Sequence, residues 1–190
     1  MYIGKNFNAY ATLLRHLRSP PIILSHTPLP NDPRRLEFTT TVPRSLAETW
    51  DFFSRPENLE KLTPPDVRFD IRSPVAGVEM YEGMIIQYRV TPFPGFTTDW
   101  VTEITQIKHH DHFIDDQRVG PFALWHHQHF FRAIDDRTTE MTDILHYQAP
   151  LRFLGTIADK FFVHRQVRGI FAAREEAIGR LFPTPHTPAA

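Results

Sequence analysis

The sequence predicts an α+β fold in which a curved antiparallel sheet of six or seven strands wraps around one long C-terminal helix. Residues 67–148 alternate apolar and polar side chains in six short segments with turn residues between them, which is typical of half-buried strands. Residues 151–182 lack proline and repeat apolar side chains every three or four positions, which indicates an amphipathic helix. Consecutive strands joined by tight turns form a meander with one buried face, and this helix is the element long enough to cover it.

The individual elements follow from local signals. Residues 36–42 are rich in strand formers and end at a proline. Ser45, with Glu48 three positions later, forms a capping box that predicts a short helix. Pro56 can open a second short helix, which two prolines stop after residue 63. The six later strands are expected near residues 67–74, 84–91, 97–107, 112–119, 123–134 and 138–148.

Composition excludes several classes of function. The 190 residues are 41% hydrophobic and 13% aromatic, enough for a sizeable core, and the net charge of −1 argues against sequence-independent nucleic-acid binding. The absence of cysteine excludes thiol catalysis and thiolate-bound zinc. No apolar run approaches the ~20 residues of a membrane helix, so integral membrane association is not expected and the cytoplasm is the default location. Phosphate-loop, dinucleotide-binding and standard hydrolase motifs are missing.

Charge and proline content divide the chain into three parts. Residues 1–35 carry five basic side chains, one acidic side chain and a proline-rich stretch, and are interpreted as an N-terminal extension. This extension either packs on its own domain or frays, or it forms a helix that binds a membrane surface or a partner, or it is a transit-like segment. Residues 36–182 form the predicted domain, and residues 183–190 a flexible tail.

The most informative segment is the histidine-rich strand around residue 127. Alternate side chains on a strand share a face, so Trp125, His127 and His129 project to one side. The same alternation puts polar side chains of the two neighbouring strands on that face. The polar residues expected to meet inside a cavity are Asp115, Gln117, His127, His129, Asp143 and Tyr147. Aromatic residues expected to line the cavity are Tyr88, Trp100, Trp125 and Phe161.

This arrangement depends on the turn at residues 135–138. A turn one residue longer or shorter would move Asp143 from beside His129 to beside Phe130, because a slip of one residue exchanges the two faces of a strand.

Four interpretations of the polar residues compete. They can form a structural cluster that fixes strand register, or the polar end of an apolar ligand pocket. They can also perform acid–base chemistry, with His127 or His129 as the proton carrier and Asp143 orienting it. A metal site is the fourth, since two histidines and a carboxylate suit zinc or iron. The first two are favoured, so we assign no catalytic residue, metal or cofactor.

The C-terminal helix also carries a charged run. Glu175 and Glu176, with Arg174 and Arg180, are interpreted as a solvated face of this helix.

Several short stretches, taken in order, resemble a known superfamily. They are residues 56–59, 62–65, 80–83, 113–117, 120–122, 125–130 and 141–143, with Tyr88, Trp100 and Gly155. As a set they are similar to the helix-grip proteins of the START, birch-pollen-allergen and polyketide cyclase superfamily (SRPBCC), and above all to its bacterial branch of uncharacterised ligand-binding-type proteins. The resemblance covers about residues 36–182. It implies the helix-grip fold and an internal pocket, and it implies no particular reaction.

The first functional hypothesis is a soluble protein that binds a hydrophobic small molecule, such as a lipid, isoprenoid, quinone or polyketide-like compound. The second is an enzyme of cyclase or dehydratase type with His127, His129 and Asp143 as its catalytic residues, because the superfamily that the chain resembles contains such members. The third is a partner-docking or chaperone-like module, as in the stress-chaperone-activator and coenzyme Q-binding branches of that superfamily. The sequence leans away from an enzyme.

Overall fold

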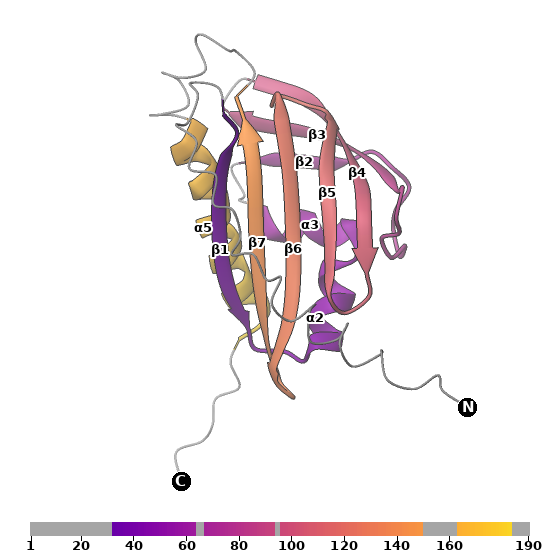
Figure 1. Ribbon diagram of the computed structural model, residues 1–190. Helices are drawn as coiled ribbons and strands as arrows, with labels where there is room; N and C mark the ends of the chain where they lie inside the picture. The colour runs from indigo at the N-terminus through magenta and orange to yellow at the C-terminus, as the bar shows by residue number, and fades with distance from the viewer. Residues whose placement is uncertain (1–31, 64–66, 94–95, 150–162, 184–190) are drawn as a thin grey trace, which may run out of the picture.

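A single antiparallel sheet of seven strands forms the body of the computed structural model (Figure 1), which describes residues 32–63, 67–93, 96–149 and 163–183. The strand order is β1-β7-β6-β5-β4-β3-β2, so the first strand pairs with the last. The strands are β1 (Arg34–Val42), β2 (Arg68–Ile71), β3 (Ile85–Phe93), β4 (Phe96–Lys108), β5 (His112–Val119), β6 (Leu124–Asp135) and β7 (Thr138–Gln148). The predicted α+β class and the predicted antiparallel meander are confirmed.

Among the described residues, three short helical segments follow β1 in the chain and precede β2, and a longer helix lies near the C-terminus. They are α2 (Leu46–Phe53), the 3-10 turn η1 (Pro56–Asn58), α3 (Leu59–Leu62) and α5 (His164–Leu181). All lie on the same side of the curved sheet (Figure 1). The long helix was expected over residues 151–182; its portion before residue 163 lies outside the described residues, as do residues 1–31 of the expected extension.

Local signals place α2 where the sequence predicts it. The Ser45 hydroxyl accepts a hydrogen bond from the Glu48 backbone N–H at 3.3 Å, and the Glu48 carboxylate accepts one from the Ser45 N–H at 3.1 Å. These bonds satisfy two backbone donors that a helix start otherwise leaves without a partner. The helix then buries Trp50 and Phe53, and the Trp50 indole N–H donates to Glu79 at 3.1 Å.

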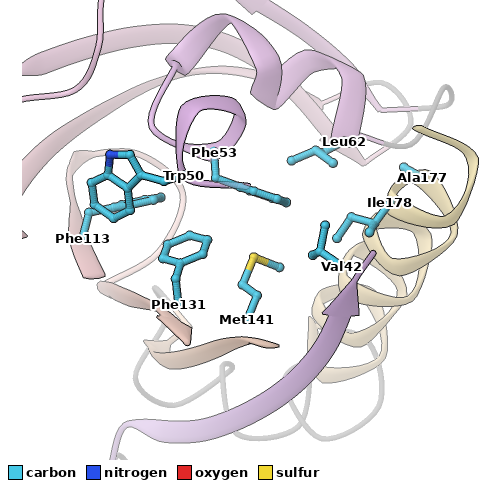
Figure 2. Close-up of a cluster of buried hydrophobic side chains, with 9 residues drawn as sticks. All are labelled: Val42, Trp50, Phe53, Leu62, Phe113, Phe131, Met141, Ala177 and Ile178. Carbon is cyan, nitrogen blue, oxygen red and sulfur yellow. The ribbon is translucent and has the colours of Figure 1, made fainter. Parts of the chain in front are cut away.

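The core at one end of the molecule joins the helices to the sheet. The ring centroids of Phe131 in β6 and Trp50 are 5.5 Å apart, and the two rings meet edge to face, which is favourable for aromatic rings. Figure 2 shows this cluster with side chains from both layers: Val42, Trp50, Phe53, Leu62, Phe113, Phe131, Met141, Ala177 and Ile178. A second cluster lies on β3 and β4 around Ile86 and Ile104, and a third joins β7 to α5 through Leu145 and Val167.

In the part of the chain that the structure describes, no helix combines the length and apolar character needed to cross a bilayer.

Candidate functional site

A cavity of about 200 Å³ lies between the sheet and the helices, bordered by members of all three core clusters. Its walls are largely aromatic. Trp100 and Trp125 meet edge to face with ring centroids 5.2 Å apart, and Phe122 packs against Trp125 at 4.7 Å. Tyr88 from β3 and Phe171 from α5 also line the cavity. The cavity is therefore suited to an apolar molecule, and polar side chains enter it at only a few points.

Strand register brings the predicted polar residues together. Asp115 of β5 pairs with His127 of β6, and His129 pairs with Asp143 of β7. The turn at residues 135–138 thus has the expected length, and the prediction that Asp143 lies beside His129 is confirmed. Because the side chains of paired residues point to the same face, the two acids and the two histidines converge on the concave side.

These four residues and Arg174 of α5 form what we call the polar cluster. His129 lies between two carboxylates: its Nε2 donates to Asp115 Oδ2 at 2.9 Å, and its Nδ1 lies 2.7 Å from Asp143 Oδ1. His127 is oriented likewise, with Nδ1 3.7 Å from Asp115 Oδ2 and Nε2 3.2 Å from Asp143 Oδ1. The rings of His127 and His129 are 3.8 Å apart. Each imidazole thus presents one nitrogen to each carboxylate.

Arg174 lies in the interior, contrary to the expectation from the sequence. It was expected on a solvated helix face, but it is only 8% exposed, with its guanidinium 3.4 Å from Asp143 and 5.4 Å above the ring of Phe53. The neighbouring acidic pair Glu175 and Glu176 made the segment resemble a surface. Arg174 follows the buried Phe171 by three positions, so the helical period puts both on the face toward the sheet, and this spacing could have revealed it.

The acids of the cluster are held in their charged form. Burial by itself raises the pKa of Asp143, but the nearby charge of Arg174 and the contacts with both histidines bring it well below its usual range. Asp115 behaves in the same way: burial raises its pKa, and the hydrogen bond from His129 with the surrounding positive charge lowers it below the ordinary value. Burial and the charge of Asp115 both raise the pKa of the Tyr88 hydroxyl, which stays neutral beside the cluster.

The two histidines are driven in opposite directions. Burial lowers the pKa of His127, the neighbouring His129 lowers it further, and the carboxylates offset only part of this effect. Burial also lowers the pKa of His129, but its contacts with Asp115 and Asp143 outweigh burial and raise the value above the ordinary one. The surroundings therefore favour the neutral form of His127 and the charged form of His129.

Several polar atoms of the cluster lack an aligned hydrogen bond. They are Nε2 of His127, Nδ1 of His129, Oδ1 of Asp143 and Nε of Arg174, all buried. The two ring nitrogens nevertheless lie 3.2 and 2.7 Å from Asp143 Oδ1. An unsatisfied buried polar group costs about 1–3 kcal/mol, so this wall is polar at the expense of stability.

The remaining predicted site residues divide into three groups. Tyr88, Trp100 and Trp125 line the cavity, together with Asp115, His127 and His129. Asp143 and Tyr147 are completely buried beside it, and the Tyr147 hydroxyl lies 3.2 Å from Nδ1 of His164. Phe161 lies outside the described residues.

Gln117 does not join the polar cluster as expected. Its side-chain amide bonds the backbone N–H and carbonyl of Phe122, at 3.3 and 2.8 Å, and so supports the connection from β5 to β6. A side chain at Gly120 would collide with this amide. The pairing of β4 with β5 is irregular between Val101 and Thr102, next to Gln117; such bulges redirect side chains, and alternation along a strand cannot reveal them.

Comparison with known proteins shows which architecture this is. No family model and no curated protein matches the chain. Among solved structures, Zhui aromatase/cyclase from Streptomyces sp. R1128 is similar with a TM-score of 0.58 at 14% identity, over 80% of this chain and 98% of that one. Norcoclaurine synthase of Thalictrum is similar with a TM-score of 0.58 at 14% identity, over 82% of this chain and 97% of that one. A START superfamily protein of Mycobacterium smegmatis is similar with a TM-score of 0.55 at 14% identity, over 77% of this chain and 98% of that one.

The chain has the helix-grip fold. The similarity to SRPBCC proteins that the sequence indicated is confirmed for the architecture: a curled antiparallel sheet, short helices after the first strand, and a C-terminal helix. At these identities the helix-grip fold is shared, and function has to be argued from the site.

Proposed function

We propose that this helix-grip chain binds a hydrophobic small molecule in its cavity and orients one polar group of that molecule with the polar cluster. The observation that carries the proposal is the composition of the wall: aromatic and aliphatic side chains make up most of it, and its polar members include Asp115, His127, His129 and Arg174 of the polar cluster. An apolar pocket with a few convergent polar groups is the usual form of a small-molecule site.

The physical basis of affinity would be burial of apolar surface, at about 25 cal/mol per Å². A dry apolar cavity of roughly 150 Å³ is enough to bind benzene, and the cavity here is about 200 Å³. This favours a compact aromatic or isoprenoid-like ligand over a long acyl chain. The edge-to-face pair of Trp100 and Trp125 supplies a rigid surface for a planar ring.

The structural neighbours support the same reading. Two of the solved proteins with this fold are named as enzymes, an aromatase/cyclase and a norcoclaurine synthase, and the latter was solved with a transition-state analogue bound. One protein with this fold therefore binds a small organic molecule. The proposal extends this property to the cavity of the present chain, whose domain we assign to residues 36–182.

The test is a panel of quinones, isoprenoids, fatty acids and polyketide-like aromatics, measured by thermal shift and native mass spectrometry. Val90 lies in the cavity wall and is 5% exposed, whereas Val119 is 55% exposed and lies outside the described lining. Val90→Phe should fill part of the cavity and weaken binding of any ligand found by at least 10-fold. Val119→Phe is the matched control and should leave binding unchanged.

Equal affinity in both variants would place the ligand outside the cavity, and no binder across the panel would count against the proposal. The other two hypotheses from the sequence, a cyclase or dehydratase and a partner-docking module, stay predictions.

A further inference from the structure

We propose that Asp115, His127 and His129 bind a divalent transition-metal ion at the cavity wall. The proposal goes beyond binding of an apolar ligand and does not depend on it. It also departs from the sequence-based expectation of no metal, because the arrangement of the two carboxylates on opposite sides of the histidine pair emerges only in three dimensions.

The donor atoms have suitable types and spacing. One ring nitrogen of each histidine and one oxygen of Asp115 lie within 4.8 Å of one another. Asp115 Oδ2 is 2.9 Å from Nε2 of His129 and 3.7 Å from Nδ1 of His127. Ligands bound at about 2.1 Å to a tetrahedral ion lie roughly 3.4 Å from each other, so small side-chain movements suffice. Two imidazoles and one carboxylate are the donor set of zinc and non-haem iron sites.

The second carboxylate lies where metal-binding histidines usually have one. Asp143 Oδ1 is 3.2 Å from Nε2 of His127 and 2.7 Å from Nδ1 of His129, the nitrogens that face away from Asp115. Such a carboxylate fixes the orientation of a metal-bound imidazole and raises its strength as a ligand. The Arg174 guanidinium lies 3.4 Å from the same oxygen and holds this carboxylate in place. A histidine pair held only for packing would not require both flanking acids.

The ion belongs on the Asp115 side of the histidines. Arg174 also lines the cavity, but its guanidinium lies 3.4 Å from Asp143, so its repulsion of a cation would be strongest on the Asp143 side, where the Asp143 side chain is 2% exposed. The Asp115 side chain is 16% exposed and lines the cavity. Three protein ligands leave at least one coordination position open, and that position would face the cavity, within reach of a bound molecule.

The cost of the cluster supports the same conclusion. Burying two carboxylates and a guanidinium in an otherwise apolar wall is expensive, and ion pairs of this kind often stabilise a protein no better than apolar side chains would. Arg174 already faces Asp143, so a divalent cation between the two imidazoles and Asp115 would compensate the remaining carboxylate.

The matched control lies on the same two strands. His126 and Asp116 pair on the opposite face of the sheet, with Nδ1 2.6 Å from Oδ1, and each is the immediate neighbour of a proposed ligand. The experiment uses the full chain without a histidine tag. Elemental analysis measures metal as purified, and Co²⁺ titration after chelation is followed by visible absorption.

We expect one ion per chain and a Co²⁺ spectrum typical of nitrogen and oxygen ligands. Asp115→Asn and His127→Ala should abolish the spectrum, while Asp116→Asn and His126→Ala should retain it. Asp143→Asn should weaken binding by about 10- to 100-fold without removing the spectrum.

The proposal is overturned if the wild-type chain binds no ion stoichiometrically, or if the outer-face variants lose binding as much as the inner-face ones. The wild-type titration requires no variant, so a variant that fails to fold does not remove the test. If the chain binds a hydrophobic ligand but no metal ion, the proposed function stands and the metal proposal fails. If it binds a metal ion but no hydrophobic ligand, the metal proposal stands and the proposed function fails.

Discussion

Arg174 shows how one residue sets the electrostatics of the cavity wall. Its guanidinium faces Asp143 and lies over Phe53, so a helix residue neutralises an acid that the sheet buries. Removing one member of a buried ion pair leaves an uncompensated charge, which is far more harmful than removing both. The charge balance of the polar cluster therefore depends on the docking of α5.

Arg174→Met should lower the free energy of unfolding by about 3–5 kcal/mol, because Asp143 would remain buried without its cation. Urea denaturation measures the change. Arg180→Met is the control. Arg180 is exposed and forms a long surface ion pair with Glu176, at 3.9 Å, so removing its charge should lower the free energy of unfolding by about 0–1 kcal/mol.

The double variant Arg174→Met with Asp143→Asn tests the cause. It should recover part of the stability, since the uncompensated charge is gone. If Asp143→Asn lowers the free energy of unfolding by the same amount in the Arg174→Met variant as in the wild type, the two side chains do not interact.

At the scale of elements, β6 separates two environments by alternation alone. His127 and His129 face the cavity and are nearly inaccessible, whereas His126 lies on the outer face beside Asp116. The strand period of two fixed this division, and pairing with β5 and β7 supplied the acids on the inner face. The same logic fails at Gln117, where the ladder is irregular.

The start of α2 offers a prediction on a single helix. Ser45→Ala removes the hydroxyl that accepts from the Glu48 N–H, and should lower the free energy of unfolding by about 1 kcal/mol. Thermal or urea denaturation measures it. Ser45→Asp should retain most of the stability, because aspartate also caps helices; equal losses in both variants would contradict a capping role.

The same cap gives a prediction about pH. Hydrogen bonds with the Ser45 side chain and backbone hold the pKa of Glu48 below its ordinary value. A carboxyl with a lowered folded pKa contributes stability that is present above its unfolded pKa, near ~4.3, and is lost as pH falls through the folded pKa. NMR titration should show a lowered pKa in the wild type and a higher one in Ser45→Ala. An unchanged value would show that the hydroxyl does not act on Glu48.

At the scale of the whole molecule, the cavity exists because a nearly straight helix cannot follow a curved sheet. Phe171 joins the helix to the sheet and lines the cavity. Its ring stacks on that of Phe38 in β1 with centroids 4.2 Å apart, and its centroid lies 5.4 Å from that of the His127 ring. The contact between α5 and β1 therefore closes the structure at the edge where the first strand meets the last.

Phe171→Ala should lower the free energy of unfolding by about 3–5 kcal/mol, through lost burial and an enlarged void. The exposed Tyr81, at 58%, gives the control Tyr81→Ala, which should change stability by less than about 0.5 kcal/mol. The larger cavity should also admit bulkier members of the ligand panel. A stable Phe171→Ala variant with an unchanged ligand range would show that this ring does not define the cavity.

The sequence by itself determined the class of fold, the order of the elements, the cap at Ser45 and the inward direction of His127 and His129. All of these depend on periodicity or on hydrogen bonds within a few residues, which local sequence specifies. Tertiary structure alone decided that Arg174 enters the interior, that Gln117 turns to the β5–β6 connection, and that Asp115 and Asp143 flank the histidines on opposite sides. These features depend on how α5 docks and where the ladder is irregular, and the distances between residues far apart in the chain are set by packing of the whole molecule.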